Sequence, residues 1–353
     1  MAGGTGGHVY PALAVAEYLR GHGIGLYWLG TRSGLESRVV PENTIRLLTI
    51  NIRGLRGKRL SRWFFAPFIL VVALVQSLWI ILKYRPSAVI GLGGFVSGPG
   101  GVAAWLLRIP LYIHEQNSIA GLTNRLLAPL ARAVMLGFPG AIKGARVVTT
   151  GNPVRKDILN VTSPEYRIAG RESLPLRLLV LGGSLGAQAL NEILPRIITS
   201  LPQGVDIELW HQTGRDHFAS TKAGYDNIRL QSCKVVPYIE DMAEAYAWAD
   251  LVMCRAGALT VSEICVVGIA SILVPYPYAV DDHQTANARY LCEAGAAILV
   301  PQTELSVGKI VDLLCRFDNE RSKLIEMAIT ARNKAFPNAT SDIGDLCMEA
   351  VNV

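Results

Sequence analysis

The stretch LRLLVLGGSLGAQALNEILPRII, residues 176–198, combines three signals in a fixed order. Apolar residues at 176–181 predict a buried strand, and Gly182, Gly183 and Gly186 predict a tight turn. The periodic apolar residues that follow predict a helix. A strand that enters a helix through a glycine-rich turn is the unit from which doubly wound parallel sheets are built. The stretch therefore predicts an α/β fold of the Rossmann type.

The beginning of the chain shows the same pattern, because a glycine-rich turn leads there into a predicted helix over 11–20. Strand-like and helix-like stretches alternate in between, except in the polar segment 160–175, which predicts a linker without a helix. We therefore expect two Rossmann-like domains with parallel sheets facing an interdomain cleft. The predicted domains are residues 1–159 and 176–335, and a last helix over 336–353 can return to the first domain.

Composition restricts the classes of protein that fit. The chain has 353 residues, of which 50% are hydrophobic and 18% charged, so it can form large buried cores. A net charge of +6 by itself indicates no polyanionic partner, but Arg53–Arg62 contains five cations and no acid. Such a stretch suits phospholipid headgroups, a phosphorylated ligand or nucleic acid, or is a solvated loop.

The six cysteines form no Cys-x-x-Cys pair and lie mostly in apolar runs, which is typical of reduced thiols in the cytoplasm.

Residues 63–82, WFFAPFILVVALVQSLWIIL, form an uncharged stretch of twenty residues. This length can cross a bilayer, but Pro67, Gln76 and Ser77 interrupt the apolar run and a strand of the predicted sheet follows it. Three interpretations remain open: a membrane span, a helix with one face on the bilayer surface, and an ordinary buried helix. We favour the second, because it leaves the basic stretch and the sheet on one side of the membrane.

Four glycine-rich or helix-opening loops are candidates for binding a phosphorylated ligand: residues 3–8, 91–101, 182–187 and 255–263. Glycine lets the backbone present its N–H groups, and the N-terminus of the following helix adds positive charge. In the third loop, Ser184 can donate its hydroxyl to a phosphate.

Glu263, in the last of these loops, is suited to accept hydrogen bonds from two ribose hydroxyl groups. The alternative is that it forms a capping box with Thr260 or faces solvent.

Two polar runs end predicted strands, at 113–124 and 275–288. They either form the rim of a site or make Asx turns and a helix cap. Their polar members are His114, Glu115, Gln116 and Asn117 in the first run, and Asp281, Asp282, His283, Gln284 and Asn287 in the second. Neither contains the ligand spacing of a metal site, so we expect a reaction that needs no metal.

Eight segments then occur in one order from end to end. They are GGTGGHVYPALAVAEYLR, GLRGK, GGFVSGPGGVAAW, HEQNSIAGLTNR, GNPVR, LGGSLGAQALN, CRAGALTVSE and DDHQTANA. In these segments the chain resembles the MurG family of bacterial N-acetylglucosaminyltransferases. The resemblance covers essentially the whole sequence and implies a GT-B fold, with an acceptor domain followed by a nucleotide-sugar domain.

The resemblance also implies a reaction and a cellular place. N-acetylglucosamine (GlcNAc) would pass with inversion from UDP-GlcNAc to the 4-hydroxyl of the muramoyl sugar of lipid I, undecaprenyl-pyrophosphoryl-MurNAc-pentapeptide, giving lipid II and UDP. No cofactor, metal or nucleic acid is implied. The enzyme would act as a peripheral protein on the cytoplasmic face of the bacterial inner membrane, against anionic inner-leaflet phospholipid. Other cell-wall synthesis proteins fit as partners.

Carried over to matching positions, the resemblance implies donor contacts in both domains. These contacts are Thr5, Gly6, Gly7, Asn117 and Arg155, then Ser184, Ile239, Ala258, Leu259, Thr260, Val261, Ser262, Glu263 and Gln284. Since Ile239 has no polar side-chain atom, we expect its backbone to meet the uracil.

Inversion in one displacement needs a base for the acceptor hydroxyl. His8 is the first candidate, because imidazole titrates near working pH, and Glu115 is the alternative. His8 could instead only position a substrate. A rival reading, an NAD-dependent dehydrogenase, expects an acid about 20 residues beyond the first turn. The sequence in that region, GIGLYWLGTRS, contains none.

A strand normally precedes a turn such as Gly3–Gly7, and relatives of this family carry a short apolar one there. Only Met1 and Ala2 stand before it in this sequence. The expectation is therefore that the first strand is missing, because the start is misplaced or the chain truncated. A product beginning at Met1 is then expected to be less stable and poorly active.

Overall fold

The computed structural model describes the chain except for residues 53–60, 184, 227, 229, 231 and 351–353. Contacts divide the chain into two compact units, each described below by itself. Unit 1 comprises Met1–Val154 and Pro337–Val353, and unit 2 comprises Arg155–Phe336. The second unit thus begins at Arg155 rather than after the expected linker.

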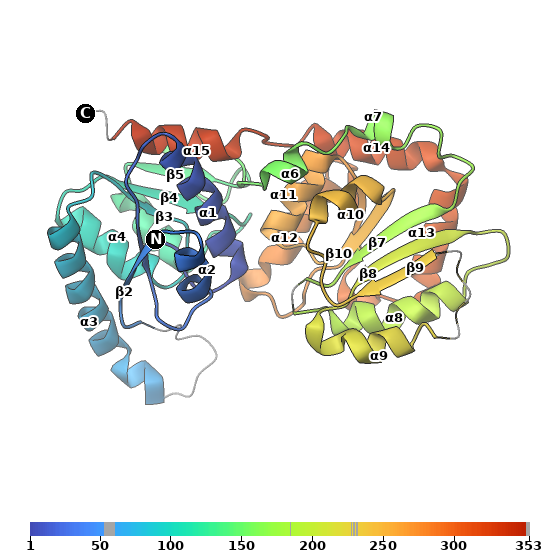
Figure 1. The fold of residues 1–353 in the computed structure, drawn as a ribbon, viewed down its shortest axis with the longest axis horizontal. Helices are drawn as coiled ribbons and strands as arrows, with labels where there is room; N and C mark the ends of the chain where they lie inside the picture. Colours follow the sequence, from blue (N-terminus) through green and yellow to red (C-terminus); the bar gives the residue numbers. More distant parts are fainter. Residues whose placement is uncertain (53–60, 184, 227, 229, 231, 351–353) are drawn as a thin grey trace. The chain divides into compact units, whose positions relative to one another are not determined.

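Unit 1 alternates helices and strands along the chain (Figure 1). Its elements are α1 (Gly6–Gly21), β1 (Tyr27–Gly30), α2 (Glu36–Glu42), β2 (Arg46–Thr49), α3 (Ser61–Tyr84), β3 (Val89–Gly91), α4 (Ser97–Leu106), β4 (Leu111–Glu115), α5 (Leu122–Leu127), the 3-10 turn Ala128–Leu130, β5 (Ala133–Leu136), β6 (Val147–Thr149) and, from the end of the chain, α15 (Ala339–Met348).

The described strands of unit 1 form two parallel sheets, with orders β1-β2 and β3-β4-β5-β6. Met1 lies beside β3, where its amino group donates to Ile90 O at 2.7 Å and its carbonyl accepts from Leu92 N at 2.9 Å. Ala2 O accepts the indole N–H of Trp28 on β1 at 2.9 Å. Burial lowers the pKa of the Met1 amino group to about 5. The first two residues therefore connect the two sheets at the place where the sequence raised the question of a strand.

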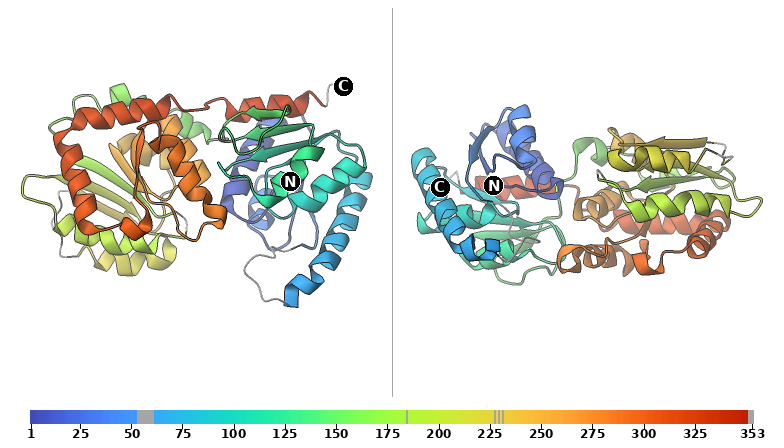
Figure 2. Two further views of the ribbon diagram at one scale, coloured as in Figure 1. Left: turned by 180° about the vertical axis from the view of Figure 1, so that it is seen from behind. Right: turned by 90° about the horizontal axis from the view of Figure 1, so that it is seen from below.

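A cavity of about 450 Å³ adjoins Met1 in unit 1, lined by residues of β1, β3, α3 and the end of α15. The end of the chain is part of the same core, since Ile343 and Cys347 of α15 are buried with Val9 and Val15 of α1. Gly344 allows this contact, because a Cβ there would overlap the ring of Tyr18. The last helix lies beside α1 in the views of Figures 1 and 2.

Unit 2 has the same alternation. Its elements are α6 (Lys156–Leu159), α7 (Pro164–Arg167), β7 (Leu176–Leu181), α8 (Gln188–Thr199), β8 (Ile207–Gln212), the 3-10 turn Arg215–His217, α9 (Phe218–Ala223), β9 (Ser232–Val236), α10 (Met242–Trp248), β10 (Leu251–Cys254), α11 (Ala258–Val267), β11 (Ala270–Leu273), the 3-10 turn Val280–Asp282, α12 (His283–Cys292), β12 (Ala297–Leu299), the 3-10 turn Gln302–Glu304, α13 (Val307–Asn319) and α14 (Arg321–Arg332).

The described strands of unit 2 form one parallel sheet with the order β12-β11-β10-β7-β8-β9. Leu178, Leu179 and Val180 of β7 are all fully buried, as expected for a strand whose two faces are both covered by helices (Figure 2). The chain proceeds outward from β7 in one direction and then, with β10, in the other. The carboxyl ends of β7 and β10 therefore meet at the switch point of the sheet, where doubly wound proteins bind ligands.

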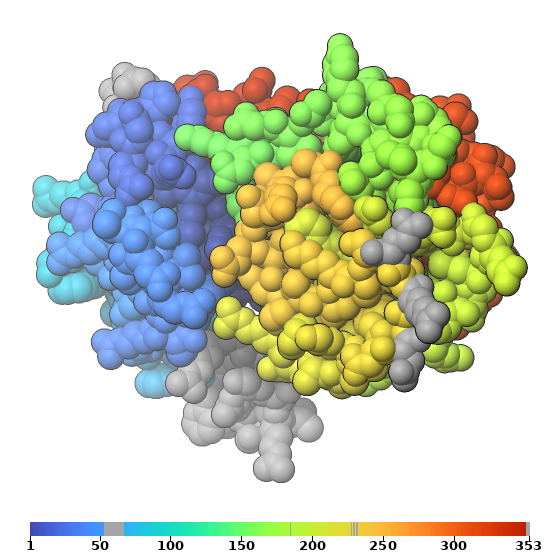
Figure 3. Space-filling view, turned by 45° about the vertical axis from the view of Figure 1, so that its right-hand side comes forward, coloured from blue at the N-terminus to red at the C-terminus, as the bar shows by residue number. Residues whose placement is uncertain are grey.

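Two expectations about the local structure of unit 2 are wrong. The segment 160–175 contains a short helix, α7, which begins at Pro164 and packs on α14. Arg167 donates to the carbonyl oxygens of Val267 and Gly268 at the end of α11, so this segment belongs to unit 2 (green in Figure 3). A strand was expected at 228–230, of which residue 229 lies outside the described residues. The strand lies instead at Ser232–Val236, where the backbone pairs with Glu208–Gln212 of β8.

Gly94 tests the close approach of the first two glycine-rich loops. Its φ is +80°, and a Cβ would overlap the carbonyl oxygen of Gly3. We expect Gly94→Ala to lower the free energy of unfolding by about 2 kcal/mol or more, measured by denaturant titration. Gly21→Ala is the control, because a Cβ there meets no atom within 4 Å. Equal stability of the two variants would contradict the close approach.

Candidate functional site

The first glycine-rich loop ends at Thr5, which is the N-cap of α1 and accepts backbone bonds from His8 and Val9. The helix begins at Gly6, five residues before the predicted start at 11, so Gly6 and Gly7 form its first turn rather than part of the loop before it. N–H groups at this position have no partner within the helix, so the loop can receive an anion or a polar sugar group.

Glu36 orders this loop, although the sequence analysis did not single it out. Its carboxylate is buried and accepts the N–H of Gly4 at 3.1 Å. It also accepts the N–H and the hydroxyl of Thr31, at 3.0 and 2.7 Å. The only sequence signal was an acid near the start of the predicted helix 34–40, and its partner Gly4 lies 32 residues away.

His8, Gln116 and His114 form a line of polar side chains in unit 1. His8 Nδ1 lies 3.1 Å from Gln116 Oε1, and Gln116 Nε2 lies 3.1 Å from His114 Nδ1. His114 Nε2 reaches the carbonyl oxygen of Gly151 at 2.9 Å. Burial lowers the pKa of His114 to about 4, so this ring stays neutral at ordinary pH.

Glu115, the alternative base, is fully engaged by its own loop. One carboxylate oxygen accepts the N–H of Asn117 at 2.9 Å, with the Asn117 amide at 3.4 Å. The other accepts the N–H of Gly121 and the amide of Asn124, both at 2.9 Å. A proton acceptor would have to give up one of these bonds. The arrangement therefore favours a role for Glu115 in holding the loop that carries Asn117.

In unit 2, glycine turns follow β7 and β10 at the switch point of the sheet. Gly182 is tightly enclosed, since a Cβ would lie 2.8 Å from Ala187 N and 3.0 Å from Gln212 O. Gly257 is the N-cap of α11, and Ala258, Leu259 and Thr260 form the first turn of that helix. Ser184, expected to contact the donor, lies outside the described residues.

Two of the expected contacts on α11 have side chains that face the interior. Val261 is fully buried, and the Ser262 hydroxyl donates to Ala258 O at 3.0 Å within the helix. Glu263, one turn into the helix, is different, because its side chain is 16% exposed.

The Glu263 carboxylate has two partners from other elements. The buried hydroxyl of Tyr246 donates to one oxygen at 3.0 Å, and the Arg155 guanidinium lies 3.7 Å from the other. Burial raises the pKa of Glu263, while Arg155 and Tyr246 oppose that shift. Tyr246 was not predicted, because it lies 17 residues away on α10.

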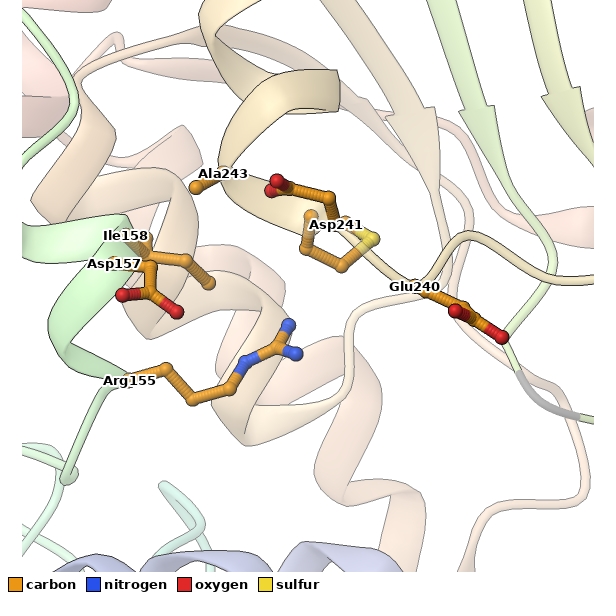
Figure 4. Close-up of a pocket in the computed structure, with 7 residues that line it drawn as sticks. Arg155, Asp157, Ile158, Glu240, Asp241 and Ala243 are labelled. Atoms are coloured by element: carbon orange, nitrogen blue, oxygen red, sulfur yellow. The ribbon is translucent and has the colours of Figure 1, made fainter.

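Arg155 also lines a pocket of about 250 Å³ with Asp157, Ile158 and the start of α10. Figure 4 shows its guanidinium pointing into the space between α6 and the segment that carries Glu240 and Asp241. The pocket thus places one cation among three carboxylates.

Ile239 lies in the loop after β9 and Gln284 in the first turn of α12, and a glutamine amide oxygen accepts a backbone N–H at each place. The Ile239 N–H donates to Gln212 Oε1 at 3.1 Å, so a ligand meets the Ile239 carbonyl or must displace Gln212. Gln284 accepts the N–H of Tyr276 at 2.9 Å. Before Gln284, Asp281 and Asp282 have φ of +53° and +51°, a strained conformation of the kind often found at functional sites.

Arg255, which was not predicted, holds the loop after β11. Its guanidinium donates to Val274 O and Pro275 O, both at 3.1 Å, and to Gln302 Oε1 at 2.6 Å. Among the residues that the structure describes, no three His, Cys, Asp or Glu side chains are grouped to hold a metal ion.

One helix in the described part of the chain is long and apolar enough to cross a membrane. The helix is α3, in which the segment Pro67–Tyr84 has a mean hydropathy of 1.9 and only 17% of its residues buried.

Both halves of the chain match models of the same protein family. The N-terminal domain of glycosyltransferase family 28 matches residues 1–136, and its C-terminal domain matches residues 177–343. Two relatives share the name UDP-N-acetylglucosamine–N-acetylmuramyl-(pentapeptide) pyrophosphoryl-undecaprenol N-acetylglucosamine transferase. That of Alkalilimnicola ehrlichii is 51% identical over 99% of this chain and 97% of its own. That of Marinobacter nauticus is 48% identical over 100% and 97%.

Solved structures agree. The crystal structure of Acinetobacter baumannii MurG superposes with a TM-score of 0.86 at 42% identity, covering 99% of this chain and 98% of that one. A UDP-GlcNAc 2-epimerase from Neisseria meningitidis, at 13% identity and a TM-score of 0.64, covers 99% and 98% and shares the fold alone.

The buried neutral His114 predicts a loss of stability in acid. Unfolding restores its ordinary pKa near 6.5, so below that pH the unfolded chain binds a proton that the folded chain does not. Its contribution is complete above about pH 6.5 and declines as the pH falls toward about 4, by up to roughly 3 kcal/mol. We expect His114→Gln to reduce the slope of unfolding free energy against pH in this window, measured by denaturant titration.

His22→Gln is the matched control, because the His22 side chain is exposed. An unchanged slope in His114→Gln would contradict the conclusion that His114 is neutral in the folded protein.

Proposed function

The chain belongs to glycosyltransferase family 28, and we propose that it transfers GlcNAc from UDP-GlcNAc to the 4-hydroxyl of the muramoyl sugar of lipid I. The products are lipid II and UDP. Relatives named for this transfer align with 98% or more of the chain, which supports the proposal. The structural observation that carries it is the Glu263 carboxylate, one turn into α11, at the switch point of unit 2.

The donor proposal follows from this placement. A carboxylate accepts two hydrogen bonds from a ribose diol, and the N-terminus of α11 supplies N–H groups for the diphosphate. Arg155, with a half-exposed side chain, adds positive charge beside Glu263. The other proposed contacts are Thr5, Gly6, Gly7, Asn117, Ser184, Ile239, Ala258, Leu259, Thr260 and Gln284. Val261 and Ser262 contribute through helix packing, because their side chains are buried.

The proposed chemistry is a single displacement. The acceptor hydroxyl oxygen forms the new bond to C1 of GlcNAc, and the bond from C1 to the diphosphate oxygen breaks, with its electron pair leaving on UDP. The hydroxyl proton passes to a base. We assign the base to His8, because Glu115 is held by four hydrogen bonds within its own loop.

The acceptor is lipid-linked, and α3 offers a surface suited to an anionic bilayer. Its five most exposed apolar residues share one face: Phe68, Val71, Val75, Trp79 and Leu82 are 58–70% exposed. The ammonium group of Lys83 lies 4.7 Å from the Trp79 ring centroid, as suits a membrane interface. Most of the basic stretch before this helix lies outside the described residues. We propose that this face docks on the cytoplasmic leaflet and that the protein acts as a peripheral membrane enzyme.

An assay with purified protein, labelled UDP-GlcNAc and a soluble lipid I analogue tests the transfer. We expect formation of the disaccharide product and release of UDP, and a drop in kcat of at least about 100-fold in His8→Ala. Folded protein that forms no product would refute the proposed function.

Calorimetry with UDP separates the roles of the two residues. Glu263→Gln should weaken UDP binding by at least about tenfold, because the ribose loses a charged acceptor. His8→Ala should leave UDP binding within about twofold of wild type. If His8→Ala loses UDP affinity and keeps its kcat within tenfold, His8 is a binding residue.

Flotation with vesicles that contain anionic phospholipid tests the docking face. We expect Val75→Glu combined with Trp79→Glu to reduce the bound fraction by at least about fivefold, because burying a carboxylate at the interface is costly. Tyr166→Glu is the control, since Tyr166 is 81% exposed and lies on α7 of unit 2. Equal flotation of all three proteins would exclude docking through α3.

A further inference from the structure

Backbone carbonyl groups determine which atoms donate and which accept in the line of side chains His8, Gln116 and His114. His114 Nε2 lies 2.9 Å from Gly151 O, and a carbonyl oxygen only accepts, so this nitrogen carries the ring proton. Since His114 is fully buried and neutral, its Nδ1 has a lone pair. The nitrogen that faces Gln116 is therefore an acceptor.

The orientation of the Gln116 amide follows from two neighbours. The same Gln116 nitrogen lies 2.8 Å from Leu92 O and 3.1 Å from His114 Nδ1. Both neighbours are acceptors, so this atom is the NH2 group and both of its protons are used. A flipped amide would place an oxygen against Leu92 O. The Gln116 carbonyl oxygen must then face His8 Nδ1, at 3.1 Å.

From this line we infer that Gln116 is a positioning residue for the base. Its carbonyl oxygen requires a proton on His8 Nδ1, so that neutral His8 carries its lone pair on Nε2. The inference rests on the proposed function for the identity of the reaction. In that reaction, His8 Nε2 takes the proton of the acceptor hydroxyl as its oxygen bonds to C1 and UDP leaves, and the resulting imidazolium keeps its Nδ1–H···O bond.

The surroundings hold this line in one arrangement. Gln116 is 1% exposed, and the amide of Asn152 donates to the Gln116 backbone carbonyl at 3.0 Å. On the His8 side, Gly93 has a φ of +95°, and a Cβ there would lie 2.6 Å from His8 Nδ1. The loop 91–97 thus leaves room for the ring only because residue 93 is glycine. Histidine in water favours the opposite tautomer, with its proton on Nε2, so the protein must impose the useful one.

The resting protein tests the inference without substrate. The full chain is labelled with nitrogen-15 in its histidine rings, and long-range proton–nitrogen NMR distinguishes a protonated ring nitrogen from one with a lone pair. We expect neutral His8 to be protonated on Nδ1, and a His8→Gln spectrum assigns its signals. A wild-type His8 with its proton on Nε2 overturns the inference.

Gln116→Met then tests whether Gln116 determines the tautomer of His8. This side chain has nearly the same volume but neither accepts nor donates, so we expect the Nε2–H tautomer of His8 to dominate. The kcat should fall at least about tenfold, as for a misplaced base, while UDP affinity stays within about twofold. A Gln116→Met protein that keeps both the Nδ1–H tautomer and the wild-type kcat overturns the inference.

Gln76→Met is the matched control, because it also removes a glutamine amide of unit 1 that forms a hydrogen bond: Gln76 Oε1 accepts the N–H of Asn51 at 2.7 Å. It should keep the wild-type kcat, which separates positioning from general loss of stability. If Gln116→Met fails to fold, the tautomer of His8 in the wild-type protein still tests the inference. An inactive wild-type protein with Nδ1–H on His8 overturns the proposed function, whereas an active protein with Nε2–H overturns only this inference.

Discussion

The loops of unit 1 depend on one constraint: a polar side chain that is buried must find its partners inside the protein. The Glu115 carboxylate accepts two backbone N–H groups and the side-chain amides of Asn117 and Asn124. The Glu36 carboxylate accepts the N–H groups of Gly4 and Thr31 and the Thr31 hydroxyl. Buried acids thus hold the first glycine-rich loop through Gly4 and the segment from Asn117 to Gly121, and glycine at residue 94 allows the close approach to Gly3.

In unit 2, an amide and a guanidinium rather than carboxylates bind the backbone groups of the loops. Gln212, at the end of β8, holds the N–H of Ile239, and Arg255, after β10, holds the carbonyl groups that follow β11. These contacts support the loops around the carboxyl ends of the central strands. They leave the first turn of α11 and the Glu263 carboxylate as the groups at this edge best suited to a nucleotide sugar. In the proposed reaction, the diphosphate meets the N-terminus of α11 and the Arg155 guanidinium.

Much of this could be predicted from local patterns. The strand, turn and helix at 176–198 are where the apolar run and the glycines placed them, and polar residues such as Glu115 and Gln116 do follow strands. The errors arose where contacts distant in sequence decide the outcome. Helix α7 forms because Arg167 reaches the end of α11, 100 residues away, and β9 begins only where β8 offers it partners. Glu36 and Tyr246 were missed for the same reason, since nothing in their neighbourhoods reveals what they bind.

The sequence by itself determined the α/β class, the glycine turns, the family and the residue types at the candidate site. Periodicity, turn formation and side-chain chemistry are properties of a few neighbouring residues, so they can be read from the chain directly. Only the tertiary structure decided which polar groups are satisfied. It engages Glu115 with four donors, gives Glu263 the partners Tyr246 and Arg155, and orients the Gln116 amide between Leu92, His114 and His8. The role of an ionisable side chain depends on the partners that surround it, and folding brings those partners from distant parts of the sequence.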